Sequence, residues 1–131
     1  MEKPLDPLCP SIQVVLDLLG RPWTGLVLAA LQTGPLRFSE LSARLTDIGD
    51  KILSARLKDL EARGLVVREV DPGPPIRVTY ALTSMGEGFR NVIEAVEVWG
   101  RQFVARDAAA RASRGAKPRE PGRPARGKVA R

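Results

Sequence analysis

The sequence contains no histidine and a single cysteine among its 131 residues. The absence of histidine excludes Ser-His-Asp and Cys-His nucleophile systems and removes the commonest zinc ligand. A single cysteine excludes an internal disulfide framework, although Cys9 could pair between chains or act as a reactive thiol. No paired carboxylates, Gly-rich phosphate loop or metal-ligand spacing stand out. We therefore predict no metal, no cofactor and no enzymatic activity.

Long apolar runs are also missing. The longest, Leu26 to Leu31, is far too short to span a bilayer. Met1 to Pro7 lacks the basic start and apolar run of a secretory signal. A hydrophobic content of 44% is nevertheless enough for a globular core. We expect a soluble cytoplasmic protein with no membrane partner.

Most of the chain has no excess of positive charge, although the net charge of the whole chain is +6. Residues 1–106 hold 13 basic and 13 acidic residues, whereas 107–131 hold eight basic and two acidic ones. Overall basicity is therefore no argument for nucleic-acid binding, and only local clustering of cations would be. We expect an N-terminal arm over 1–8, one domain over 9–106 and a disordered basic tail over 107–131. That tail either adds nonspecific phosphate contacts or only keeps the protein in solution.

What the chain does have is apolar residues at helical spacing. They predict one helix opened by Cys9-Pro10 and ended by Gly20, a second starting at Pro22, and a third from about Phe38 to Leu45. A fourth helix starts at Lys51 and is ended by Gly64, with Leu53, Leu57 and Leu60 on its apolar side.

The turn before the fourth helix is short. Ile48 is expected to anchor it in the core, with Gly49 or Asp50 as the N-cap. Two short helices joined by such a turn match a helix-turn-helix.

Two predicted strands follow, over 65–70 and 76–82, separated by the loop 71–75. A hairpin directly after a helix-turn-helix is the winged-helix arrangement, so the fold class is mostly α with a small β-hairpin wing. Arg77 at the base of the wing would reach a phosphate or the adjacent minor groove, or be only a solvated strand residue.

A last helix, capped by Thr83 or by a Ser84–Glu87 capping box, carries a long apolar stripe. Such a stripe favours a dimer interface, packing on the first helix, or both. The predicted interface residues are Ile12, Val15, Phe89, Val92, Ile93, Val96, Trp99 and Phe103.

The polar face of the fourth helix is the predicted contact with double-stranded DNA. Lys51, Ser54 and Lys58 would reach phosphates and base edges, and Ala55 would allow close approach. An ordinary solvated helix face is the alternative. Arg37 and Arg56 are predicted phosphate contacts, unless Arg56 pairs with Glu40 or Glu61. The interpretation requires the cations on this helix and Arg77 to share one surface.

The motifs together resemble the HxlR-type family of bacterial winged-helix regulators, over about Cys9 to Phe103. The resemblance is carried by Cys9-Pro10, Trp23-Thr24, the stretches 34–41 and 51–61, Gly64-Leu65-Val66 and 77–83. It implies a homodimer that binds an inverted-repeat operator as a repressor or an activator. Gly49 stands where the family commonly has a capping serine, and Thr79 replaces an acid near the base of the wing.

Some members of the family use a cysteine near the N-terminus to sense oxidants or electrophiles, so the resemblance marks the position of Cys9 as a candidate redox sensor. If Cys9 is the N-cap before Pro10, the helix dipole favours its reactive thiolate. The alternative is a small side chain that packs the first helix. A small-molecule effector near Trp23 and Trp99 is a second signal route. A winged-helix adaptor that binds a protein instead of DNA is the main alternative function, and the neutral charge of 1–106 leaves it open.

Overall fold

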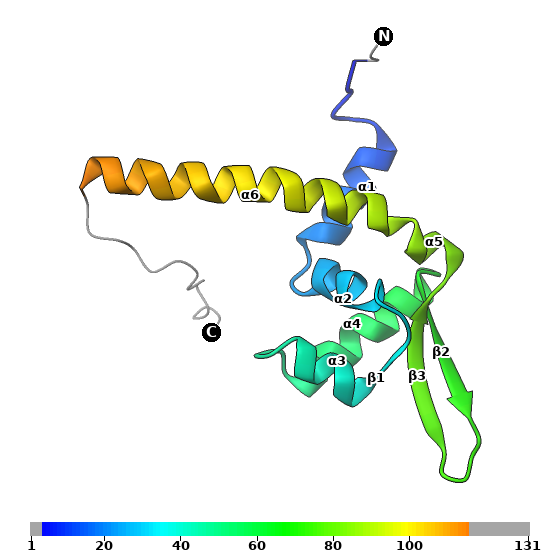
Figure 1. Ribbon diagram of the computed structural model, residues 1–131. Helices are drawn as coiled ribbons and strands as arrows, with labels where there is room; N and C mark the ends of the chain where they lie inside the picture. The colour runs from blue at the N-terminus through cyan, green and yellow to red at the C-terminus, as the bar shows by residue number, and fades with distance from the viewer. Residues whose placement is uncertain (1–3, 116–131) are drawn as a thin grey trace. The chain divides into compact units, whose positions relative to one another are not determined.

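The protein is described by a computed structural model over residues 4–115, and its chain forms two units, Met1–Glu94 and Ala95–Arg131. The described helices and strands are shown in Figure 1. They are, in order, α1 (Pro10–Gly20), α2 (Thr24–Leu31), β1 (Leu36–Arg37), α3 (Phe38–Arg44), α4 (Asp50–Ala62), β2 (Val66–Asp71), β3 (Arg77–Leu82), α5 (Ser84–Glu87) and α6 (Phe89–Arg114). The predicted fold class, mostly α with a small hairpin, is confirmed.

The core of the first unit lies between α2, α3, α4 and the sheet. The core consists mainly of leucines at helical spacing, because the side of each helix that faces its neighbours is apolar. The fully buried leucines are Leu28, Leu31, Leu41, Leu53, Leu57 and Leu60. Three of these six belong to α4, so burial of that helix fixes which of its sides faces outward.

The sheet has three antiparallel strands in the order β1-β3-β2. The hairpin of β2 and β3 was predicted, and its register pairs Val66 with Leu82 at one end and Asp71 with Arg77 at the other. The third strand, β1, was not predicted, since two residues carry no alternation. It pairs Leu36 with Tyr80 and ties the start of α3 to the wing.

The turn into α4 has the predicted anchor and cap. Ile48 is buried, and Gly49 is the N-cap, without a side-chain capping bond. At the other end Gly64 has a φ of 78°, a conformation that favours glycine. Its N–H donates to the Glu61 carbonyl and the Leu65 N–H donates to the Leu60 carbonyl, which ends the helix and starts the strand.

The junction between α1 and α2 differs from the prediction. The second helix begins at Thr24 instead of Pro22, because Trp23 has a φ of 71° and lies outside helical geometry. A bulky residue in this left-handed region is uncommon and is held there by its surroundings.

The last predicted helix is two helices. Thr83 is the N-cap of α5; its hydroxyl accepts from the Gly86 N–H at 3.1 Å and donates to the Gly64 carbonyl at 2.7 Å. The Ser84–Glu87 capping box is wrong, since Ser84 is already helical. A Cβ at position 86 would clash with the Leu65 carbonyl, so glycine is required where α5 crosses that loop.

The predicted disorder from Asp107 is wrong over its first part, because α6 continues to Arg114. Alanine is the strongest helix former, and Asp107 pairs with Arg111 one turn later at 2.9 Å. The rest of the predicted tail, 116–131, lies outside the described residues. Within 4–115 no single helix is long and apolar enough to cross a membrane; α1 and α2 pass that test only as a pair bent by 91°.

Candidate nucleic-acid interface

The outer face of α4 is defined by what lies opposite the buried leucines. At about 100° per residue, Lys51, Ala55 and Lys58 lie on the side away from Leu53, Leu57 and Leu60. All three are exposed, and Ser54 is half-buried at the edge of the same face. The structure thus brings together four of the predicted contact residues, two cations, a hydroxyl and a small side chain that permits close approach to a groove.

The first turn of α4 has free backbone N–H groups, because Gly49 offers no side chain to cap them. Such groups attract anions, including phosphates. Asp50 stands in that turn and opposes an incoming phosphate. The N-terminus of α4 therefore contributes less to phosphate binding than an uncharged first turn would.

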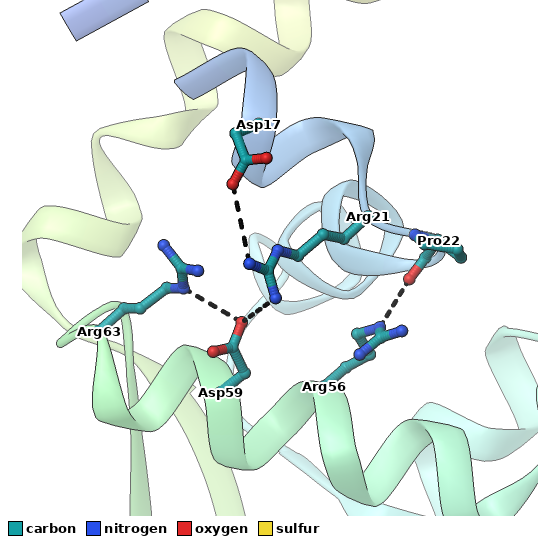
Figure 2. A network of polar contacts seen from close by, with 6 residues as sticks. All are labelled: Asp17, Arg21, Pro22, Arg56, Asp59 and Arg63. Carbon is teal, nitrogen blue, oxygen red and sulfur yellow. Dashed lines mark hydrogen bonds and ion pairs between the residues drawn. The ribbon is translucent and has the colours of Figure 1, made fainter. Parts of the chain in front are cut away.

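Arg56 does not share the outer face, and this part of the prediction is wrong. Its Nε donates to the Pro22 carbonyl at 2.8 Å, so its side chain turns toward the α1–α2 junction (Figure 2). Arg56 also forms no ion pair with Glu40 or Glu61, the two partners that the sequence suggested. The requirement that the cations of α4 and Arg77 share one surface is therefore not met by Arg56. On α4, the exposed cations opposite the buried leucines are Lys51 and Lys58.

A polar network beside Arg56 was missed by the sequence analysis. Asp59 Oδ2 lies 3.1 Å from Arg63 Nε and 4.0 Å from Arg21 Nη1 (Figure 2). The other terminal nitrogen of Arg21, Nη2, lies 3.7 Å from Asp17 Oδ2. Spacing of four residues signals the Asp17–Arg21 and Asp59–Arg63 pairs. The pair between Arg21 and Asp59 joins segments far apart in sequence, and no local sequence pattern predicts it.

Two arginines of the sheet, Arg37 and Arg77, share one face with two acids. Arg37 lies opposite Thr79, and Thr79 lies opposite Glu69 on β2; Arg77 lies opposite Asp71. Side chains alternate along a strand, so these residues share the sheet face that turns away from buried Leu36. Both arginines are exposed. Arg77 has the Asp71 residue directly opposite, whereas Thr79 separates Arg37 from Glu69.

The hairpin holds one further exposed cation, Arg68, that the sequence analysis did not single out. It lies opposite Tyr80 and two residues from buried Val66, on the face that carries the core. Alternation from Val66 is the signal that could have placed it there.

Cys9 is the N-cap of α1, as predicted, with Pro10 in the first turn. The backbone N–H groups of Ile12 and Ser11 at the start of α1, and the Ser11 hydroxyl, favour the thiolate and lower the pKa of the Cys9 thiol below its ordinary value. The thiol is only partly covered. A thiolate at a helix N-terminus is the form of cysteine that reacts with electrophiles.

The predicted dimer residues fall into two groups. In the first unit, Val15, Phe89 and Val92 line an apolar groove of about 270 Å³, together with Leu18 and Met85. Ile12 and Ile93 are half-buried. In the second unit, Trp99 is 64% exposed and its ring stacks on that of Phe103, with centroids 5.2 Å apart; Val96 is also exposed. Both groups present apolar side chains of a kind enriched at protein interfaces.

Comparison with known proteins gives the family. The profile of the HxlR-like helix-turn-helix proteins matches residues 18–108. The chain is 38% identical over 96 residues to the HTH-type transcriptional regulator YodB of Bacillus subtilis, covering 73% of this chain and 86% of that protein. It is 40% identical over 93 residues to an HTH-type regulator of Methanothermobacter thermautotrophicus, covering 71% of each.

Solved structures agree with this assignment. The reduced form of YodB superposes with a TM-score of 0.68 at 38% identity, over 73% of this chain and 94% of that one. The redox regulator HypR in its oxidized form gives a TM-score of 0.66 at 32% identity, over 72% and 96%. These matches give no support to the adaptor alternative. The chain belongs to the HxlR-like family of helix-turn-helix transcriptional regulators.

Proposed function

We propose that the protein binds an inverted-repeat operator as a homodimer, with the outer face of α4 in the major groove of each half-site. Lys51, Ser54 and Lys58 contact base edges and phosphates, with Ala55 at close range. Arg37 and Arg77 contact flanking phosphates. The observation that carries this proposal is the separation of α4 into a face of fully buried leucines and an opposite face with exposed Lys51 and Lys58.

Selection of bound sequences from random duplex DNA tests the operator. A symmetric dimer predicts two inverted half-sites whose centres are roughly one turn of DNA, about 34 Å, apart. Recovery of no enriched sequence would contradict sequence-specific binding. A single unpaired half-site would contradict the dimer.

The apolar side chains of the two groups described above support the dimer. Val15, Phe89 and Val92 line an open groove, and Trp99 and Phe103 are exposed. Exposed aromatic residues of this size mark interaction sites. Sedimentation of a Trp99→Ala protein is expected to show weaker association than wild type. Unchanged association would remove Trp99 from the interface.

We further propose that Cys9 makes the regulator sensitive to oxidants or electrophiles. Its position at the N-cap of α1 and its lowered pKa support this. Two solved structures similar to this chain are those of diamide-treated YodB and of quinone-bound YodB. With one cysteine per chain, oxidation by diamide joins Cys9 of two chains, or Cys9 and a small thiol. Two thiols lose two protons and two electrons, and the diamide is reduced to the hydrazine.

Replacement of Cys9 by serine tests this sensing. Wild-type protein treated with diamide or a quinone is expected to change its affinity for the selected operator, and Cys9→Ser protein is not. An equal change in both proteins would contradict a role for Cys9. A regulator of this kind acts where the operator is, so we place it in the cytoplasm, as a binding protein and not an enzyme.

A further inference from the structure

One flank of α4 is attached to the junction between α1 and α2. Arg56 and Asp59 are three residues apart, so their side chains leave the helix on the same flank. Arg56 donates to the carbonyl of Pro22, and Asp59 faces the guanidinium of Arg21 (Figure 2). Arg56 thus holds the Pro22 carbonyl, and Asp59, which pairs more closely with Arg63 at 3.1 Å, lies 4.0 Å from Arg21. Both side chains belong to the helix that we place in the DNA groove.

The contact from Arg56 acts on a backbone held under strain. The Pro22 carbonyl belongs to the peptide unit that leads into Trp23, whose φ of 71° is unfavourable for a bulky residue. Strained backbone persists only where its surroundings hold it. A charged donor at 2.8 Å from that carbonyl fixes the orientation of the peptide unit.

Geometry separates Arg56 from the DNA-facing cations. It lies two residues before Lys58, and this spacing places the two side chains about 160° apart around the helix axis. Lys58 is exposed, whereas Arg56 is half-buried.

We propose that Arg56 and Asp59 are positioning residues, which set the orientation of α4 against the α1–α2 junction and so aim Lys51 and Lys58, without touching DNA. This rests on the proposed function of the outer face. It predicts that loss of the cation Arg56 and loss of the acid Asp59 both weaken operator binding. Simple electrostatics toward DNA would give them opposite effects.

The test measures affinity for the selected operator at several salt concentrations, with full-length protein. Arg56→Met removes the donor and is expected to weaken binding about three- to tenfold. The slope of log affinity against log salt stays that of wild type, because no phosphate contact is lost. Arg56→Gln loses the charge but keeps an N–H donor, so it is expected to bind more tightly than Arg56→Met, also with the wild-type slope.

Lys58→Gln is the matched control. It is expected to weaken binding and to lower the slope by about one, since one cation that lies against the DNA is lost. Asp59→Ala is expected to weaken binding, and combining it with Arg21→Gln adds little further loss. Thermal unfolding confirms that each variant is folded; if Arg56→Met is not, Arg56→Gln and Asp59→Ala carry the test.

The inference is overturned if Arg56→Met binds as tightly as wild type, or if Arg56→Gln lowers the salt slope as Lys58→Gln does. Tighter binding by Asp59→Ala also overturns it, since that result means that Asp59 only repels phosphates. Unchanged affinity and slope in Lys58→Gln would instead overturn the proposed outer face, and with it the premise of the inference.

Discussion

Asp71 and Arg77 lie directly opposite each other at the outer end of the β2–β3 ladder. On the same sheet face, Thr79 of β3 separates Arg37 of β1 from Glu69 of β2. On this face Arg77 therefore has an acid directly opposite, and Arg37 has one a strand farther away. This local balance matches the equal numbers of basic and acidic residues in 1–106.

Removal of the acid opposite Arg77 is expected to strengthen DNA binding. In Asp71→Asn the Arg77 guanidinium keeps its charge, and one carboxylate that repels phosphates is gone. We expect about a twofold gain in operator affinity at low salt, shrinking as salt rises, because exposed charges are screened. Fluorescence anisotropy with labelled operator measures it. Weaker binding by Asp71→Asn would show that Asp71 orients Arg77 instead.

The buried leucines of α4 are expected to contribute more to the free energy of unfolding than the exposed residues of the same helix. Leu57 is 1% exposed, and Leu57→Ala is expected to lower the free energy of unfolding by about 2–5 kcal/mol. Ile52, in the same helix, is 41% exposed, and Ile52→Ala is expected to cost no more than about 1 kcal/mol. Urea unfolding at one fixed protein concentration compares the two. Equal losses would contradict the assigned orientation of α4.

The pH dependence of Cys9 alkylation follows from its lowered pKa. The thiolate is the reactive form, so the rate rises with pH, with a midpoint below that of an unstructured cysteine peptide. Ser11→Ala removes one hydroxyl that favours the thiolate, so the midpoint moves to higher pH and the rate at neutral pH falls.

Labelling by an iodoacetamide dye followed against pH gives both midpoints. The chain has one cysteine, so all label reports Cys9. Cys9→Ser protein supplies the background. A wild-type midpoint equal to that of the peptide would remove the helix N-terminus as an activating element.

The basic residues beyond Arg114 are expected to supply nonspecific affinity, since residues 1–106 carry no net charge. The variant replaces Lys117, Arg119, Arg123, Arg126, Lys128 and Arg131 by glutamine in the full chain. Affinity for a duplex without operator is expected to fall, with a shallower salt slope. The selected operator consensus stays the same. An unchanged slope would show that this segment makes no phosphate contact.

The sequence alone predicts those helices and strands whose apolar residues recur at a helical or alternating spacing. Leu53, Leu57 and Leu60 predict both the existence of α4 and its buried side, and alternation predicts the β2–β3 hairpin. The same logic fails for β1, because Leu36-Arg37 is too short to alternate. It fails again at Asp107, where the absence of an apolar period predicts disorder although alanine and an Asp107–Arg111 pair support a helix.

The sequence predicts a site residue correctly only where the direction of its side chain follows from the helix or strand that contains it. Lys51 and Lys58 are placed by the helix period, and Cys9 by the cap before Pro10. Arg56 could not be placed, because its partner is the backbone carbonyl of Pro22, and any residue type supplies a carbonyl. Arg21 and Asp59 meet only through tertiary packing, which a local pattern does not encode.

The central claim is that the outer face of α4 reads the operator. The most direct measurement repeats the selection from random duplex DNA with Ser54→Ala and Lys58→Ala proteins and compares each consensus with that of wild type. We expect each variant to lose its preference at particular base pairs in both half-sites, while the half-site spacing stays the same. An identical consensus for wild type and both variants would contradict the claim.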